Sequence, residues 1–179
     1  IIPTGVHIPD LYDKENLRDE LEIDKDKKIL LYLGRLGEEK NIEEIIEYYD
    51  KLDDPSIEFL IVGGGPHLNK LIDYSKNFKN KANFIGMVDP SEVNKFYQIA
   101  DIFTTASTSE TQGLTYYEAL SNGTVAVCRK DEALCGVIVN GYNGYVYEDF
   151  EDFEKIINKV LNRKFKAYLS KNARSYAIE

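Results

Sequence analysis

Short apolar runs alternate with segments of helical periodicity along most of this chain, and this alternation restricts the fold more than any other feature. The run "KILLYLG" at 28–34 is continuously apolar after its first residue and ends in glycine, which is typical of a strand buried on both faces. The next segment, 42–52, places Ile42, Ile45 and Tyr49 at helical spacing. Such an alternation predicts a doubly wound α/β fold, in which helices cover both faces of a parallel sheet.

The same pattern continues to the end of the chain. Strands are predicted at 57–63, 82–86, 101–107 and 124–129, and the segment 136–148 is predicted to hold a sixth short strand or a hairpin. Helices are predicted around 67–77 and at 90–100, 113–123, 151–161 and 165–178. No repeat or interdomain linker interrupts the series, so the sequence predicts one domain that spans residues 1–179.

Composition and charge exclude several classes of protein. The 22 basic and 31 acidic residues give a net charge of −9, which argues against a nucleic-acid surface on this segment. No apolar run approaches the roughly 20 residues that cross a bilayer. A zinc site needs about four ligands, which the two cysteines alone cannot supply. Cys128 lies in an apolar run and is expected in the core, and Cys135 is expected to be a reduced loop thiol. A disulfide between the two cysteines is left open. This use of cysteine favours the cytosol. The chain opens on Ile1, so we expect it to be cut from a longer protein.

Two known motifs are matched only in part. "VGGGPHL" has Gly63 and Gly65 in G-x-G spacing, but Leu68 stands where a dinucleotide fingerprint has its third glycine, and the ribose-binding acid is missing. A tight turn that lets a ligand approach the backbone is the better interpretation. "DKD" at 24–26 is formally a metal-binding D-x-D, but it precedes the first strand in a lysine-rich turn, so we interpret it as a solvated loop.

A candidate anion site follows the first strand in "GRLGEEKN", because ligands of doubly wound sheets bind beyond the carboxyl ends of the strands. Arg35 and Lys40 flank this loop at the N-terminus of the next helix. Free N–H groups, an arginine fork and a lysine charge together would form a diphosphate cradle. An alternative is equally compatible with the sequence: Arg35 and Lys40 pair with neighbouring glutamates such as Glu39 on the surface.

Two glutamates flank the helix that follows the fourth strand, in "TSETQGLTYYEAL". Glu110 precedes a helix predicted to begin at Gly113, and Glu118 lies more than a turn inside it. The N-terminus of this helix is predicted to point into the same cleft as the cradle. A carboxylate accepts hydrogen bonds through two oxygens, so Glu110 suits sugar hydroxyls and Glu118 a ribose diol. Either acid alone could be a surface residue, and their combination with the cradle favours ligand binding.

Several segments stand in a characteristic order along nearly the whole chain: "IPTGV", "GRLGEEKN", "VGGGP", "FIGMV", "ADIFTTASTSETQGLTYYEALSNGTVAV" and "GVIVNGYNGYVY". In this order they resemble the C-terminal, nucleotide-sugar-binding half of retaining GT-B glycosyltransferases of glycosyltransferase family 4. The part "ETQGLTYYEAL" with "DEALCGVIVNGYNG" is especially similar to diacylglycerol glucosyltransferases. The resemblance implies a Rossmann-like half of a GT-B fold that binds a UDP-sugar, with UDP-glucose as the first choice.

The resemblance also implies roles for individual residues. Arg35 and Lys40 would bind the donor diphosphate, and Glu110 would position the donor sugar; these three form the expected catalytic set. Gly113 and Leu114 would offer backbone N–H groups to the phosphates. As the nucleotide departs, the two cations and the helix N-terminus would stabilise the growing negative charge, so neither a metal nor a cofactor is expected.

The nucleoside part of the donor is assigned in the same way. Glu118 would hold the ribose hydroxyls, and Met87 and Val88, after "FIG", would lie beside the base. The expected donor-binding set also includes Gly34 and Gly64, which lie in the two glycine turns that follow the first and second strands.

The resemblance implies a missing partner as well. The family carries its acceptor site in an N-terminal half that is absent here, and the terminal helix at 165–179 would run back toward it. We therefore expect this chain to bind a donor and to turn nothing over alone. The location expected is the cytoplasm or the inner face of the cell membrane, with any membrane contact made through the missing half.

Three other functions remain open from the sequence. The donor domain could serve a cell-surface polysaccharide or a protein in place of a lipid such as diacylglycerol, or it could belong to a nucleotide-sugar-binding or epimerase domain without an acceptor. A Rossmann oxidoreductase is the most distant alternative, because Leu68 and the missing ribose acid both argue against it.

Overall fold

A parallel sheet forms the centre of the computed structural model, which describes residues 7–108 and 114–178. Within these residues the sheet has six strands in the order β3-β2-β1-β4-β5-β6, and every pair of neighbours is parallel. The strands are β1 Lys28–Leu33, β2 Ile57–Val62, β3 Asn83–Gly86, β4 Ile102–Thr105, β5 Val125–Arg129 and β6 Gly144–Tyr147. The predicted doubly wound parallel sheet is therefore confirmed.

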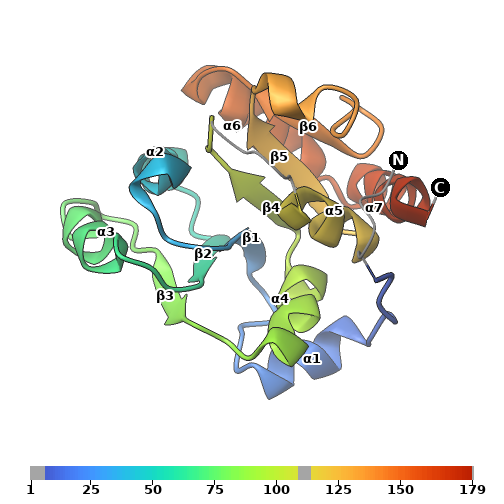
Figure 1. Cartoon of the computed structure of the whole chain (residues 1–179), viewed down its shortest axis with the longest axis horizontal. Helices are drawn as coiled ribbons and strands as arrows, with labels where there is room; N and C mark the ends of the chain where they lie inside the picture. Colours follow the sequence, from blue (N-terminus) through green and yellow to red (C-terminus); the bar gives the residue numbers. More distant parts are fainter. Residues whose placement is uncertain (1–6, 109–113, 179) are drawn as a thin grey trace.

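Helices cover both faces of the sheet (Figure 1). One face packs against α2 Ile42–Leu52, α3 Leu68–Ser75 and α6 Phe150–Val160, and the other against α1 Lys14–Glu20, α4 Val93–Ile99 and α5 Leu114–Ser121. The last helix, α7 Arg163–Ile178, packs against α5 and α6 and contributes to both cores through Leu169 and Ala173. Single 3₁₀ turns lie at Glu38–Lys40, Pro90–Glu92 and Glu132–Leu134.

The apolar runs are continuous because both faces of the sheet are buried. Leu31, Phe59 and Ala126 have no measurable exposure, and the side chains of β1 alternate between the two hydrophobic clusters. Leu30 and Tyr32 join the cluster under α2, whereas Leu31 joins the cluster under α4. This two-sided burial is the physical reason that the sequence shows runs where a half-exposed strand would show alternation.

The predicted elements agree with the structure to within a few residues, with two corrections. Of the two alternatives for 136–148, the short strand is confirmed: β6 is parallel and pairs with β5. The helix predicted at 90–100 begins as a 3₁₀ turn, because Asp89 caps Ser91 and Pro90 restricts the first turn. Helix α1 was not predicted; Asp13 caps it through the N–H of Asn16, and the buried Leu17 anchors it.

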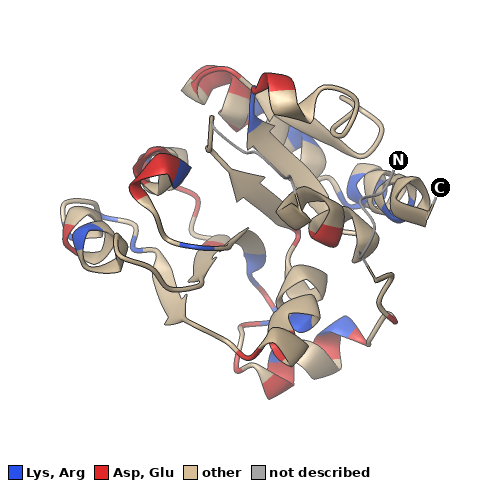
Figure 2. Ribbon diagram, viewed as in Figure 1, with Lys and Arg blue, Asp and Glu red and all other residues tan. Residues whose placement is uncertain are grey.

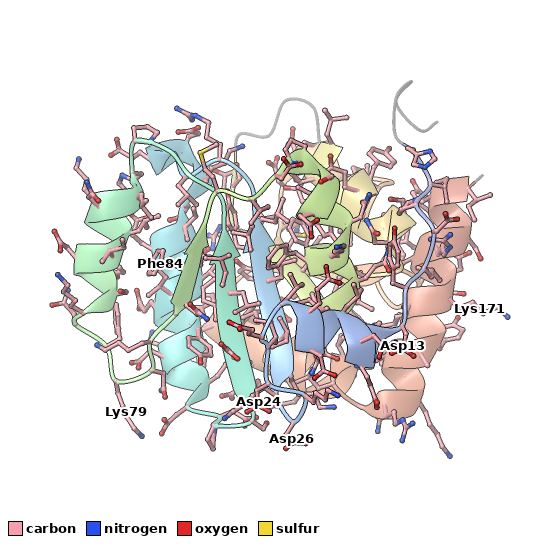
Figure 3. The ribbon with its side chains drawn as sticks, turned by 90° about the horizontal axis from the view of Figure 1, so that it is seen from below. Asp13, Asp24, Asp26, Lys79, Phe84 and Lys171 are labelled. Atoms are coloured by element: carbon pink, nitrogen blue, oxygen red, sulfur yellow. The ribbon has the colours of Figure 1, made fainter. Side chains whose placement is uncertain are left out.

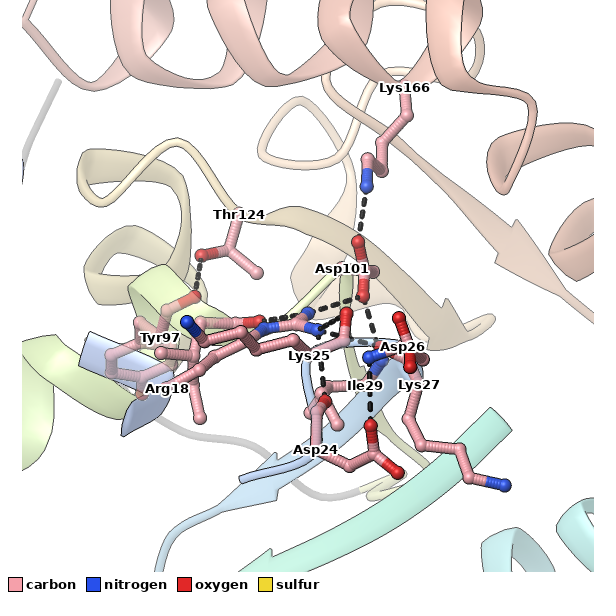
Figure 4. Close-up of polar contacts among 11 residues, drawn as sticks. Arg18, Asp24, Lys25, Asp26, Lys27, Ile29, Tyr97, Asp101, Thr124 and Lys166 are labelled. Atoms are coloured by element: carbon pink, nitrogen blue, oxygen red, sulfur yellow. Dashed lines mark hydrogen bonds and ion pairs between the residues drawn. The ribbon is translucent and has the colours of Figure 1, made fainter. Parts of the chain in front are cut away.

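A buried ionic cluster fastens this helix to the amino ends of the strands (Figure 4). One nitrogen of Arg18 donates to the carboxylate of Asp101 at 3.2 Å and to the carbonyl of Ile99 at 3.0 Å. Lys166 of α7 pairs with the other oxygen of Asp101, whose carboxylate also accepts the N–H of Ile29 at 2.7 Å. The cluster therefore joins α1, β1, β4 and α7 around a single carboxylate.

The "DKD" segment belongs to this end of the molecule. Arg18 donates to the carbonyl oxygens of Asp24, Lys25 and Lys27, and the carboxylate of Asp24 accepts the N–H of Asp26. Figure 3 shows Asp24 and Asp26 at the end of the sheet from which the strands begin. The segment is thus a local turn far from the carboxyl ends of the strands, as interpreted from the sequence.

Acidic residues occur on several of the helices and on the loops between elements (Figure 2). Helix α2 has acids in its first turn at Glu43 and Glu44, and α6 has Glu151 and Asp152 at its start. In the part of the chain that the structure describes, no helix has both the length and the apolar composition needed for crossing a bilayer.

Replacing Asp101 with asparagine should lower the free energy of unfolding by about 3 kcal/mol at pH 7, because Arg18 and Lys166 would lose their buried counter-ion. Burial alone would raise the pKa of Asp101, but Lys166, the N–H of Ile29 and Arg18 together bring it below the ordinary 3.8. The carboxylate therefore stabilises the fold above the unfolded pKa, and this contribution is lost as the pH falls through the lower native pKa.

Urea denaturation between pH 3 and pH 7 tests this expectation. The unaltered chain should lose more stability than Asp101→Asn on acidification, so the two curves should converge at low pH. Asp73→Asn, which breaks the exposed pair with Lys76, is the matched control and should change little. Parallel pH curves for Asp101→Asn and the unaltered chain would contradict the assignment.

Candidate functional site

The strand order reverses direction between β1 and β4. From β1 the chain proceeds to β2 and β3 on one side, and then crosses to β4, β5 and β6 on the other. The loops after β1 and β4 therefore lead away from each other, and a crevice opens at the carboxyl ends of these two strands. Gly34 and Arg35 follow β1 here, and Ala106 and Ser107 follow β4.

A cavity of about 280 Å³ occupies this crevice. Its wall includes four predicted site residues, Gly34, Arg35, Lys40 and Leu114. The remaining lining residues are Tyr32, Leu33, Glu39, Phe103, Thr105 and Thr115. The wall thus combines two cations with the first residues of α5, where N–H groups have no partner within the helix. This combination suits an anion such as a phosphate.

A second cavity of about 360 Å³ shares Leu33, Gly34 and Arg35 with the first. It contains the other predicted loop residues, Gly64, Met87 and Val88. The other lining residues are Val62, Gly63 and Val93. Apart from Arg35 the lining is apolar or glycine, and Met87 is 83% exposed. The adaptable thioether of Met87, next to exposed backbone, is better suited to binding a ligand with a flat ring than to binding a charged ligand.

The glycines between these cavities are required by close backbone packing. A Cβ atom on Gly63 would lie 1.9 Å from the carbonyl oxygen of Gly34, and one on Gly65 would lie 2.5 Å from that of Leu36. The two loops are also hydrogen-bonded, since Leu36 N–H donates to the Gly64 carbonyl at 2.9 Å and His67 N–H to the Leu36 carbonyl at 3.0 Å. The G-x-G spacing therefore reflects contact between neighbouring loops, which accounts for it without a dinucleotide fingerprint.

Arg35 both lines the cavities and forms an ion pair. Its guanidinium donates to the carboxylate of Glu39, four residues later, and both side chains are about half exposed. The N–H of Glu39 itself and the charge of Arg35 lower the pKa of Glu39, so the acid is ionised at neutral pH. Arg35 thus fits both interpretations of the loop, as part of an anion site and as the partner of a neighbouring glutamate. Its guanidinium lies at the cavity, where an anionic ligand would compete with Glu39 for it.

Glu118 lies on α5, half-buried and outside the lining of both cavities. The hydroxyl of Tyr97 donates to its Oε2 at 3.0 Å. Burial raises the pKa of Glu118, and the hydrogen bond from Tyr97 opposes that rise. The other two predicted residues of this segment, Glu110 and Gly113, lie outside the described residues.

Several residues of the site were not predicted. Phe103, Thr105 and Tyr32 line the first cavity but lie in strands, where the sequence pattern indicates only burial. Asn41 has a left-handed backbone with φ of 50°, and its amide donates to the Ala106 carbonyl at 3.5 Å and to Glu44 at 3.3 Å. Asparagine is one of the few residues other than glycine that adopt this conformation, which is the only signal in the sequence.

No cluster of three or more metal-ligating side chains occurs among residues 7–108 and 114–178. Both cysteines are free: Cys128 is buried, with its thiol pKa raised by burial, and Cys135 is exposed. The predicted core and loop positions of the two cysteines are confirmed, and the disulfide that was left open is absent.

Comparison with known proteins identifies the same architecture. The family model described as Glycosyl transferases group 1 matches residues 13–176. The alpha-monoglucosyldiacylglycerol synthase of Acholeplasma laidlawii is 36% identical over 186 aligned positions, which cover 97% of this chain and 46% of that protein. The synthase of the same name from Streptococcus pneumoniae is 34% identical, with 90% and 39% covered. The chain spans less than half the length of each of these two relatives.

Solved structures agree on the fold. HepE of Anabaena in complex with UDP superimposes with a TM-score of 0.85 at 20% identity, over 98% of this chain and 51% of that one. The C-terminal domain of LpcC, a glycosyl transferase group 1 family protein of Francisella tularensis, gives a TM-score of 0.82 at 20% identity and covers 97% of both chains. The predicted Rossmann-like half of a GT-B fold is confirmed.

Replacing Gly63 with alanine should cost at least about 2 kcal/mol more unfolding free energy than replacing Gly86, because the new methyl group would overlap the Gly34 carbonyl. Gly86 also has a positive φ, +87° against +135° for Gly63, but its Cβ would meet nothing within 4 Å. The pair therefore separates overlap from backbone strain. Urea denaturation of both variants provides the measurement, and equal losses would refute the close-packing argument.

Proposed function

Because this chain belongs to the glycosyl transferases group 1 family, we propose that it is the donor-binding domain of a glycosyltransferase that uses a UDP-sugar. The observation that carries the proposal is the meeting of two unlike cavities at Gly34 and Arg35. One is lined by Arg35 and Lys40, and the other by Met87 and Val88. A nucleoside diphosphate is divided in a similar way, into an anionic diphosphate and a nucleoside whose flat, uncharged base could lie against an apolar wall.

UDP-glucose is the donor we propose. HepE, whose fold this chain shares, was crystallised with UDP and with UDP-glucose. The two relatives with 36% and 34% identity are both named as monoglucosyldiacylglycerol synthases, which supports glucose as the sugar. In this assignment the base lies against Met87 and Val88, the diphosphate between Arg35, Lys40 and the start of α5, and the ribose at Glu118.

The reaction breaks the bond between the anomeric carbon of the sugar and the diphosphate oxygen. Both electrons of that bond leave with the diphosphate, while an acceptor hydroxyl forms the new bond to carbon and loses its proton. Arg35 and Lys40 would stabilise the leaving group, and preorganised charge of this kind is commonly the largest catalytic contribution. We assign Glu110 to positioning the sugar. Since two cations and helix N–H groups supply the counter-charge, we expect no metal requirement.

A membrane lipid such as diacylglycerol is the acceptor we propose, because the names of both relatives specify it. These relatives are more than twice as long as this chain, which supports an acceptor half carried elsewhere in the protein. We therefore propose that the 179-residue chain binds the donor without turnover, in the cytoplasm or at the inner face of the cell membrane. A polysaccharide or protein acceptor would leave the donor site as described.

Titration calorimetry with UDP, UDP-glucose, GDP and NAD tests the donor assignment. We expect saturable binding of UDP and UDP-glucose without added metal. The double variant Arg35→Ala/Lys40→Ala should weaken UDP binding about tenfold or more, because each charge-assisted hydrogen bond contributes about 1.5–3 kcal/mol. Glu118→Ala should weaken it as well, since the ribose would lose an acceptor.

The matched control is Lys76→Ala/Lys79→Ala, which removes two exposed lysines that pair with Asp73 and Asp53. It should leave UDP affinity unchanged. Binding of NAD in preference to UDP would refute the transferase assignment. Equal weakening of UDP binding by both double variants would show that Arg35 and Lys40 act only through the net charge of the protein.

A further inference from the structure

Tyr97 is a fully buried tyrosine whose hydroxyl reaches a proposed site residue. It lies on α4 with no measurable exposure, and its hydroxyl donates to Glu118 Oε2 at 3.0 Å. Its ring meets Phe103 edge to face, with centroids 5.6 Å apart, and Phe103 meets Tyr116 at 6.3 Å. Phe103 also lines the first cavity. The position of the hydroxyl is therefore fixed by the packing of the core against the site.

The main chain of Glu118 is held by the same helix pair. Its carbonyl accepts the side-chain amide of Asn122 and the hydroxyl of Ser121, each at 2.9 Å. Asn122 in turn donates to Asn94 and accepts from Gln98, both on α4 and both at 2.9 Å. Helix α4 thus fixes the backbone of Glu118 through amides and its carboxylate through one hydroxyl.

Helix α4 also borders the second cavity. Val93 lines that cavity and stands four residues before Tyr97, so the two side chains lie on the same face of the helix. Both belong to one hydrophobic cluster, which agrees with this placement. One face of α4 therefore both borders the cavity where we place the nucleoside, through Val93, and binds Glu118, through the hydroxyl of Tyr97.

We propose that Tyr97 is a positioning residue, which holds one carboxylate oxygen of Glu118 so that the other faces the ribose hydroxyls of the nucleotide. The inference rests on the proposed function, because it takes the ribose as the ligand of Glu118. A hydroxyl that donates to the carboxylate leaves it an acceptor, as a diol requires. Holding one oxygen also removes side-chain freedom before the ligand arrives, which reduces the entropic cost of binding.

The test compares UDP with its 2′,3′-dideoxy analogue, which lacks both ribose hydroxyls, on Tyr97→Phe. This variant keeps the ring and removes only the hydroxyl. The unaltered chain should prefer UDP to the analogue by about tenfold, and Tyr97→Phe should reduce that preference about fivefold while binding the analogue as before. A role in stability alone would change the melting temperature without changing the preference.

Tyr49→Phe is the matched control. Tyr49 is also a buried tyrosine, and its hydroxyl donates to the Ile57 carbonyl at 3.0 Å on the opposite face of the sheet. Its loss should leave the affinities for UDP and for the dideoxy analogue unchanged. A Tyr49→Phe variant that reduces the preference as Tyr97→Phe does would overturn the inference.

A second measurement, by NMR, uses only the unaltered chain. The hydroxyl proton of Tyr97 is sheltered from water, so its NMR resonance reports on the hydrogen bond to Glu118. It should shift when UDP binds and stay in place with the dideoxy analogue. A resonance that ignores UDP would overturn the inference even if Tyr97→Phe failed to fold.

The possible failures are distinguishable. If Tyr97→Phe weakens both ligands equally, or neither, Tyr97 has no part in positioning and the proposed function stands. If the unaltered chain binds UDP without preferring it to the analogue, the ribose assignment of Glu118 and this inference both fall, while the diphosphate cradle remains. A chain that binds neither ligand would overturn the proposed function together with the inference.

Discussion

The contact between the loops that follow β1 and β2 is the constraint on which the whole carboxyl edge depends. Gly63 lies so close to the Gly34 carbonyl that a Cβ atom there would be 1.9 Å away, and hydrogen bonds from Leu36 and His67 lock the loops together. Arg35 projects from this junction and borders both cavities. These contacts fix the backbone from which Arg35 projects, so the side chain starts from a defined position beside the cavities.

The carboxyl edge carries local positive charge at its first cavity, although the net charge of the molecule is negative. The chain carries a net charge of −9, and acidic residues lie in the first turns of helices α2 and α6. Arg35 and Lys40 nevertheless stand together at one cavity, with Glu39 as the counter-ion of Arg35. The ion pair is half exposed and hence weak. A diphosphate offers more charge and more acceptors, so under our proposal it would replace Glu39 as the partner of Arg35.

The fold could be predicted from the sequence because two-sided burial leaves continuous apolar runs, as in β1 and β2. Helix α1 escaped prediction since it is short and anchored mainly by Leu17 and the ionic contacts of Arg18. At the site, Arg35 and Lys40 were predictable from their place after a strand, and Met87 and Val88 only through a family resemblance. Phe103 and Tyr97 could not be predicted as site residues, because in a sequence a buried aromatic residue near a site looks the same as one in the core.

Helix α4 gives the two cavities a common support. It begins at Val93 against the apolar cavity, and one turn later Tyr97 reaches the carboxylate of Glu118 on α5. Thr124, where β5 is about to begin, donates its hydroxyl to the Tyr97 carbonyl at 2.6 Å, so the same residue is also tied to the sheet. A shift of α4 would therefore move Val93 in the wall of the apolar cavity and the carboxylate of Glu118 together. If the nucleoside binds as we propose, recognition of the base and of the ribose both depend on how this one short helix packs.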